Sequence, residues 1–305
     1  MNTVMTVTGP VPATELGMTL THEHIFINLM REYRGDGLLH DEQLMCEEVA
    51  RFRQAGGGTI VDVTTEELGR NPLGLKRISE ATGVNIVMGT GHYRDPYLDR
   101  AWFDRMSATQ IADLMVADVN EGIDGSGVKA GIIGEIGADK WFVSTAEERS
   151  FRAAALTQQR TGLTITTHAA RWAVGREQLR ILTEAGADPA RVIVGHCDTV
   201  PDMSYHEELA RGGSYVQFDC IQGESAYQVE RVASYILNLL RKGFGRQVLL
   251  SHDICLTSNL SVNGGAGYDY IPTRFVPVLR EKGLGQSDIE MLTVDNPRRA
   301  LTGEG

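Results

Sequence analysis

The sequence has 305 residues, a formal net charge of −11, and 42% hydrophobic residues. The negative charge excludes a basic nucleic-acid-binding surface, and no apolar run approaches the ~20 residues of a membrane span or forms a signal segment. The four cysteines show no C-x-x-C spacing, which predicts reduced thiols in a cytoplasmic protein. From the charge and the absence of a long apolar run, we expect neither nucleic-acid nor membrane partners.

Strand-like apolar runs alternate with amphipathic, helix-like stretches along the whole chain. The expected strands are 18–22, 58–64, 85–90, 130–135, 163–168, 191–196, 214–219 and 247–252, and the clearest helical stretches are 41–54, 108–120, 147–161 and 228–241. Eight strands alternating with helices predict an α/β fold, a TIM (β/α)8 barrel formed as one domain over residues 1–305. A doubly wound open sheet is the alternative, but no Gly-rich phosphate loop follows the first strand.

The first strand ends in Thr21-His22-Glu23-His24. Residues two apart on a strand point to the same face, so His22 and His24 aim at one point while Glu23 turns away. Two imidazoles that converge from a strand end form half of a zinc-type site.

Four more candidate ligands follow later strands. Glu135 ends the fourth expected strand, His168 the fifth and His196 the sixth, and Asp253 follows the eighth. The C-terminal ends of barrel strands meet at one rim, so all six side chains can reach one cavity. Four histidines and two carboxylates are too many for one tetrahedral zinc ion, but they suit two divalent ions bridged by a carboxylate and a hydroxide.

These motifs, together with Gly195-His196-Cys197-Asp198 and Asn296-Pro297, occur in order from about residue 8 to residue 301. They resemble the phosphotriesterase-related family of the amidohydrolase superfamily. The resemblance implies a TIM barrel with a binuclear zinc-type centre that hydrolyses esters, lactones, amides or organophosphate triesters. Zn²⁺ is the expected ion, with Mn²⁺ or Co²⁺ as alternatives.

The resemblance also implies a role for each ligand. His22, His24 and Asp253 would hold the buried ion, His168 and His196 the more exposed one, and Asp253 would also accept a proton. Many family members bridge the ions with a carbamylated lysine, where this sequence has Gly134 followed by Glu135. The sequence resembles the branch with a glutamate bridge. Because a one-residue shift turns a side chain to the other face of a strand, Glu135 needs a local bulge or an irregular strand end to reach the ions.

Two further positions bear on the substrate. Cys220 stands where efficient organophosphate hydrolases carry a proton-relaying histidine, and Asp198 resembles the outer acid of that relay. We therefore expect a metal-bound hydroxide to attack a small carboxyl ester, lactone or amide. Organophosphate triester hydrolysis, as main or side activity, is one alternative. A non-catalytic binding protein on the same barrel, with a metal lost, is another.

The expected substrate contacts follow the third, fifth and seventh strands. Tyr93 is a candidate pocket wall, and His92 either donates to the substrate or caps a loop. Arg94 or Arg171 could hold an anionic group through two hydrogen bonds, and Cys220 completes the set. The glycine-rich segment 256–270 is a candidate lid. We also expect a homodimer.

Overall fold

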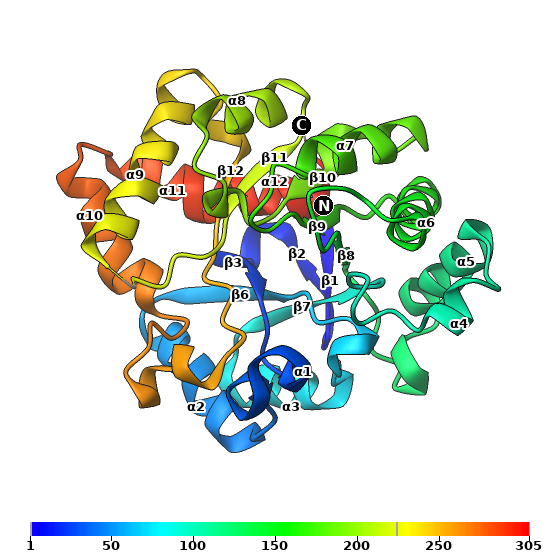
Figure 1. Cartoon of the computed structure of the whole chain (residues 1–305). Helices are drawn as coiled ribbons and strands as arrows, with labels where there is room; N and C mark the ends of the chain where they lie inside the picture. Colours follow the sequence, from blue (N-terminus) through cyan, green and yellow to red (C-terminus); the bar gives the residue numbers. More distant parts are fainter. Residues whose placement is uncertain (1, 224, 305) are drawn as a thin grey trace.

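The computed structural model describes residues 2–223 and 225–304, and it contains eight parallel strands in one curved sheet (Figure 1). Neighbouring strands follow the order β3-β6-β7-β8-β9-β10-β11-β12. Their bounds are β3 Met18–Glu23, β6 Gly57–Asp62, β7 Asn85–Thr90, β8 Ile132–Gly137, β9 Ile165–His168, β10 Val192–Val194, β11 Tyr215–Phe218 and β12 Val248–Leu250. The predicted eight-stranded TIM barrel is confirmed, with every expected strand found within a few residues of its place.

Helices cover the outside of the barrel (Figure 1). They are α1 Met30–Tyr33, α2 Glu42–Gln54, α3 Pro72–Thr82, α4 Arg100–Phe103, α5 Ala108–Asn120, α6 Thr145–Thr161, α7 Gly175–Glu184, α8 Met203–Arg211, α9 Ala226–Arg241, α10 Val276–Glu281, α11 Gln286–Glu290 and α12 Asn296–Thr302. Local sequence sets their ends. At α6, Ser144 and Glu147 form a reciprocal capping box at the start, and Gly162 ends the helix with a φ of 72°.

The N-terminal end of the barrel is closed by short segments from outside the eight-stranded sheet. Two short hairpins accompany the barrel, β1 Thr3–Thr6 with β2 Gly9–Pro12 and β4 Ile27–Asn28 with β5 Leu38–Leu39. Val4 of β1 and Leu301 of α12 belong to one buried cluster with strand residues such as Val61 and Leu249. Apolar side chains therefore fill this end, and the polar groups collect at the C-terminal strand ends.

The seam between β3 and β12 is joined by one buried carboxylate. Glu23 Oε1 accepts hydrogen bonds from the Ser251 hydroxyl at 2.7 Å and from His252 N at 2.8 Å, and it lies 2.9 Å from His252 Nδ1. Glu23 Oε2 accepts a bond from Ile254 N at 2.9 Å. Side-chain bonds thus hold the first and last strands together and fix the backbone on both sides of Asp253.

Replacing Glu23 by glutamine should lower the free energy of unfolding by about 3 kcal/mol. The amide loses charge-assisted hydrogen bonds, and its NH2 group would face N–H or O–H groups that also donate. Urea denaturation measures this. Exposed Glu47→Gln on α2 is the control and should change stability little. Equal stability of Glu23→Gln and wild type would mean that the seam does not depend on this carboxylate.

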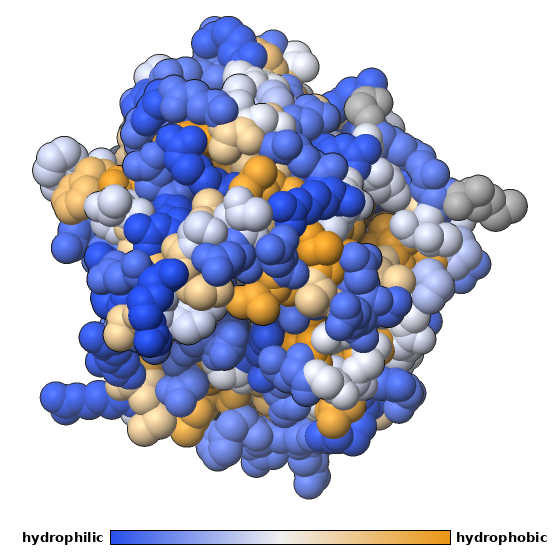
Figure 2. Space-filling model, turned by 90° about the vertical axis from the view of Figure 1, so that its right-hand side faces the viewer, coloured by the Kyte–Doolittle hydropathy of each residue, from blue (hydrophilic) through white to orange (hydrophobic). Residues whose placement is uncertain are grey.

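The face that carries α4, α5 and α6 is largely hydrophilic, with apolar side chains visible in several smaller areas between polar ones (Figure 2). Among the described residues, no helix is long and apolar enough to cross a membrane. The single domain and the homodimer stay predictions.

Candidate metal centre

Four histidine side chains from the strand ends converge around Glu135. Its Oε2 lies 3.0 Å from His168 Nδ1 and 3.6 Å from His196 Nε2. The same oxygen lies 3.6 Å from His22 Nε2, while Oε1 lies 3.4 Å from His24 Nε2. The structure thus brings together all four predicted histidines on a single carboxylate.

Glu135 reaches the centre through an irregularity in β8. The pairing of β8 with β9 shifts register between Ile133 and Ile136, and Gly134 has a φ of 118°. A Cβ at Gly134 would lie 2.2 Å from the Thr166 carbonyl oxygen, so this backbone excludes any side chain at that position. The strand is thus irregular at the position where the sequence predicts a bulge or an irregular end, and its backbone leaves no room for a lysine side chain at position 134.

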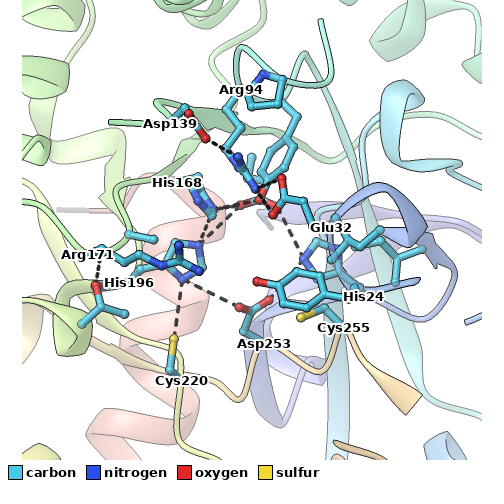
Figure 3. A pocket seen from close by; sticks show the side chains of 18 residues that line it. His24, Glu32, Arg94, Asp139, His168, Arg171, His196, Cys220, Asp253 and Cys255 are labelled. Atoms are coloured by element: carbon cyan, nitrogen blue, oxygen red, sulfur yellow. Dashed lines mark hydrogen bonds and ion pairs between the residues drawn. The ribbon is translucent and has the colours of Figure 1, made fainter. Parts of the chain in front are cut away.

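Asp253 approaches from the opposite side. Its Oδ1 lies 3.3 Å from His24 Nε2 and 3.7 Å from His22 Nε2. The Asp253 side chain is 19% exposed, whereas those of His22 and His24 are at most 2% exposed. Asp253 is therefore the more exposed of the two cluster carboxylates, Glu135 and Asp253, both of which line the pocket (Figure 3).

A second layer of polar groups orients the histidines. Asp219 Oδ1 lies 2.8 Å from His196 Nδ1, and its Oδ2 lies 3.4 Å from His22 Nδ1. Thr64 Oγ1 lies 2.9 Å from His24 Nδ1. Partners of this kind fix which imidazole nitrogen faces a metal. We missed Asp219 as an orienting group, although it follows a strand just as Asp253 does.

Charges within the cluster compensate one another. Burial raises the pKa of Glu135, but His22 and His168 outweigh it and hold that pKa well below its usual range. Burial lowers the pKa of His24, but Asp253 and Glu135 raise it to about 9. Burial and the adjacent His196 lower the pKa of His168 to about 4. Near pH 7, His24 is therefore protonated and His168 is neutral beside an ionised Glu135.

The donor set fits a divalent cation. Ligand atoms about 2.1 Å from a tetrahedral zinc ion lie about 3.4 Å apart, close to the 3.3–3.7 Å separations of His22 and His24 from the two carboxylates. Neither ring nitrogen of buried His22 forms a hydrogen bond within residues 2–223 and 225–304. On the other side, His168 Nδ1 and His196 Nε2 lie 2.7 Å apart and next to Glu135 Oε2.

A pocket of about 480 Å³ opens beside these groups. His24, Glu135, His168, His196 and Asp253 form its floor. The predicted contacts Tyr93, Arg94, Arg171 and Cys220 all line it as well. The Tyr93 hydroxyl lies 3.4 Å from His168 Nδ1, so this ring forms a wall directly above the cluster.

Two expectations for the pocket are not met. His92 does not line it: its Nδ1 lies 2.5 Å from Glu67 Oε1, and its ring packs on Phe103. The segment 256–270 does not line it either. The Tyr268 hydroxyl donates to the His24 carbonyl at 2.7 Å, and Ser261 N donates to buried Glu48. Hydrogen bonds to residues far away in the sequence therefore hold this segment in place.

Comparisons with known proteins agree with this geometry. The sequence model of the Phosphotriesterase family matches residues 2–301. The chain belongs to the phosphotriesterase family. It is 37% identical to the phosphotriesterase homology protein of Escherichia coli, over 92% of this chain and 96% of that protein. It is 31% identical to the N-acetyltaurine hydrolase of Dictyostelium discoideum, over 98% and 97% of the two chains. A lactonase from Listeria monocytogenes superimposes with a TM-score of 0.92 at 28% identity, covering 99% of this chain and 100% of that one.

Phosphotriesterase-family proteins are binuclear metal-dependent hydrolases. Of the two positions compared with a proton relay in the sequence, Asp198 is buried and Cys220 is partly buried. Asp198 Oδ2 accepts a hydrogen bond from Cys220 N at 2.9 Å, and Asp198 does not line the pocket. Burial and the nearby Asp219 raise the pKa of Asp198 to about 7. Burial also raises the pKa of Cys220 well above its usual range, so its thiol is neutral near pH 7.

Proposed function

We propose that this chain is a binuclear metal-dependent hydrolase that cleaves a small carboxyl ester, lactone or amide. One observation carries the proposal: four histidines lie within 3.6 Å of Glu135, and Glu135 lines a pocket of about 480 Å³ together with Asp253 and three of these histidines. The similarity to a lactonase and to an N-acetyltaurine hydrolase, an amide-cleaving enzyme by its name, supports carbonyl substrates.

The roles follow from position. His22, His24 and Asp253 would hold the buried ion, His168 and His196 the more exposed ion, and Glu135 would lie between them. When bound, two divalent ions supply hydroxide near neutral pH and stabilise negative charge in the transition state. Zn²⁺ suits this set of nitrogen and oxygen donors, and Mn²⁺ or Co²⁺ are alternatives.

Asp253 is suited to accept the proton of the attacking water. Burial raises its pKa, but His24, His196 and His22 outweigh burial and keep the pKa below its usual value. Asp253 is therefore ionised near neutral pH while its side chain faces the pocket. Tyr93 is the reverse case: burial raises its pKa, so the phenol keeps its proton and can donate to a substrate oxygen.

Organophosphate triester hydrolysis is the second candidate, favoured by the family match. A neutral Cys220 thiol lies where efficient organophosphate hydrolases have a histidine, and it cannot relay a proton at pH 7 as an imidazole does. We therefore propose such activity only as a side reaction.

Elemental analysis of protein expressed with added zinc tests the metal centre, with about two ions per chain expected. A panel of lactones, N-acyl amino acids and related amides, and aryl phosphotriesters tests the reaction. Turnover of lactones or amides above phosphotriesters supports the proposal. Two ions without any turnover, or none with tight ligand binding, would favour a binding protein.

Metal binding should release protons. Because the pKa of His24 is about 9 without metal and a metal ligand must be neutral, loading at about pH 7.5 should release at least about one proton per chain. The apparent affinity should fall as the pH falls below about 9. Calorimetry in two buffers of different ionisation enthalpy measures the protons. The His24→Ala variant should release fewer protons on metal binding than the wild type. Equal proton release by the two proteins would show that His24 is not a ligand.

A further inference from the structure

Two arginines line the pocket, but one of them is already neutralised. Arg94 Nη2 lies 2.6 Å from both carboxylate oxygens of Glu32, and Nη1 also pairs with Asp139. Its guanidinium stacks 5.0 Å from the centre of the Tyr93 ring. Two carboxylates therefore satisfy the single charge of Arg94, which leaves it little attraction for a substrate anion.

Arg171 differs in this respect. Its guanidinium forms no ion pair and no hydrogen bond among residues 2–223 and 225–304. It lines the same pocket, and its side chain extends toward the His196 side of the cluster (Figure 3). An arginine that faces a binding pocket without a carboxylate partner is free to pair with a ligand.

The backbone of Arg171 is held in place next to the metal centre. Arg171 has a φ of 70°, a left-handed conformation that is uncommon for a residue with a side chain. Its N–H donates to Thr199 Oγ1 at 2.7 Å, and the Thr199 hydroxyl donates to the His196 carbonyl at 2.7 Å. Two short bonds thus couple the arginine to a proposed metal ligand and fix where its side chain starts.

With two divalent ions bound, the charges that line the pocket would favour an anionic ligand. Glu32 and Asp139 are paired with Arg94, and Glu135 and Asp253 face the proposed cations. Among the described residues that line the pocket, Arg171 is therefore the arginine without a carboxylate partner. A planar guanidinium presents two parallel N–H groups that match a carboxylate or sulfonate.

We propose that Arg171 binds the anionic end of the substrate, a carboxylate or sulfonate remote from the scissile carbonyl. This proposal rests on the proposed hydrolase function and names its substrate class: small acyl compounds with a terminal oxyanion. Arg171 acts as a specificity-determining residue, while Arg94 stays a structural part of the wall.

Matched amides test the proposal with the zinc-loaded protein. The probes are N-acetyltaurine with a sulfonate, N-acetyl-β-alanine with a carboxylate and N-acetylethanolamine, which is neutral. Arg171→Gln should lower kcat/KM by about 10- to 100-fold for the two anionic amides and by less than about threefold for the neutral one. Arg171→Lys should recover part of the loss, and exposed Arg105→Gln is the control for the charge change. Equal losses on all three amides, or no loss on the anionic ones, would overturn the proposal.

A binding measurement without turnover tests the role of Arg171 separately from the hydrolase function. If the wild type turns over no amide, the proposed amide hydrolysis fails, and calorimetry with ethanesulfonate and propionate decides on Arg171. At least about tenfold weaker binding to Arg171→Gln than to Arg105→Gln supports the anion site. The same Kd for both variants refutes it.

Discussion

Replacing Asp253 by asparagine should lower kcat by at least about 10²-fold, within the roughly 10²–10⁴-fold range of general acid–base groups. Asparagine keeps the size of the side chain but cannot accept the proton of the attacking water. KM should change less, because this role belongs to the transition state. The wild type should lose activity as acidification protonates Asp253, and the variant should lack or greatly flatten that limb. Steady-state kinetics across pH measures both effects.

Metal content is the control, because Asp253 is also a proposed ligand, with its Oδ1 3.3 Å from His24 Nε2. If the variant retains both ions and kcat falls less than about tenfold, Asp253 is not the base. Asp198 would be the next residue to test. His92 would not, because it pairs with Glu67 outside the pocket.

Replacing Glu135 by glutamine should weaken metal binding by more than the roughly 10–100-fold typical of outer-shell partners, and kcat should fall with it. A neutral amide is a poor bridge between two dications, and all four histidines lie within 3.6 Å of this carboxylate. Elemental analysis and zinc titration measure the loss. Glu67→Gln is a matched control, because Glu67 is also a poorly exposed glutamate that pairs with a histidine.

The same centre should need no carbamate. After chelation, activity should return with metal alone, since Gly134 leaves no room for a lysine bridge. Reactivation that depends on added bicarbonate would instead point to a modified lysine and refute the assignment of Glu135.

Much of the barrel and the convergence of the candidate metal ligands could be predicted from local sequence. Each candidate ligand follows an apolar run, and the end of such a run can be recognised from local sequence. The barrel topology then places the C-terminal ends of all the strands at one rim. His22 and His24 converge because strand side chains alternate, which needs no distant contact. The eight strands lie within a few residues of their predicted places for the same reason.

Contacts between distant segments decided the rest. The register shift of β8 depends on its pairing with β9, and it turns Glu135 toward the histidines. In the sequence, Arg94 and Arg171 are equally good candidates for binding an anion, because each follows a strand. The structure distinguishes them, because Arg94 pairs with Asp139 and with Glu32, which is 62 residues away. His92 pairs with Glu67, a contact that the sequence alone does not show. Local sequence therefore determined which side chains lie at the C-terminal rim of the barrel. The tertiary structure decided which of these side chains have ion-pair partners, because the partners come from segments that are distant in the sequence.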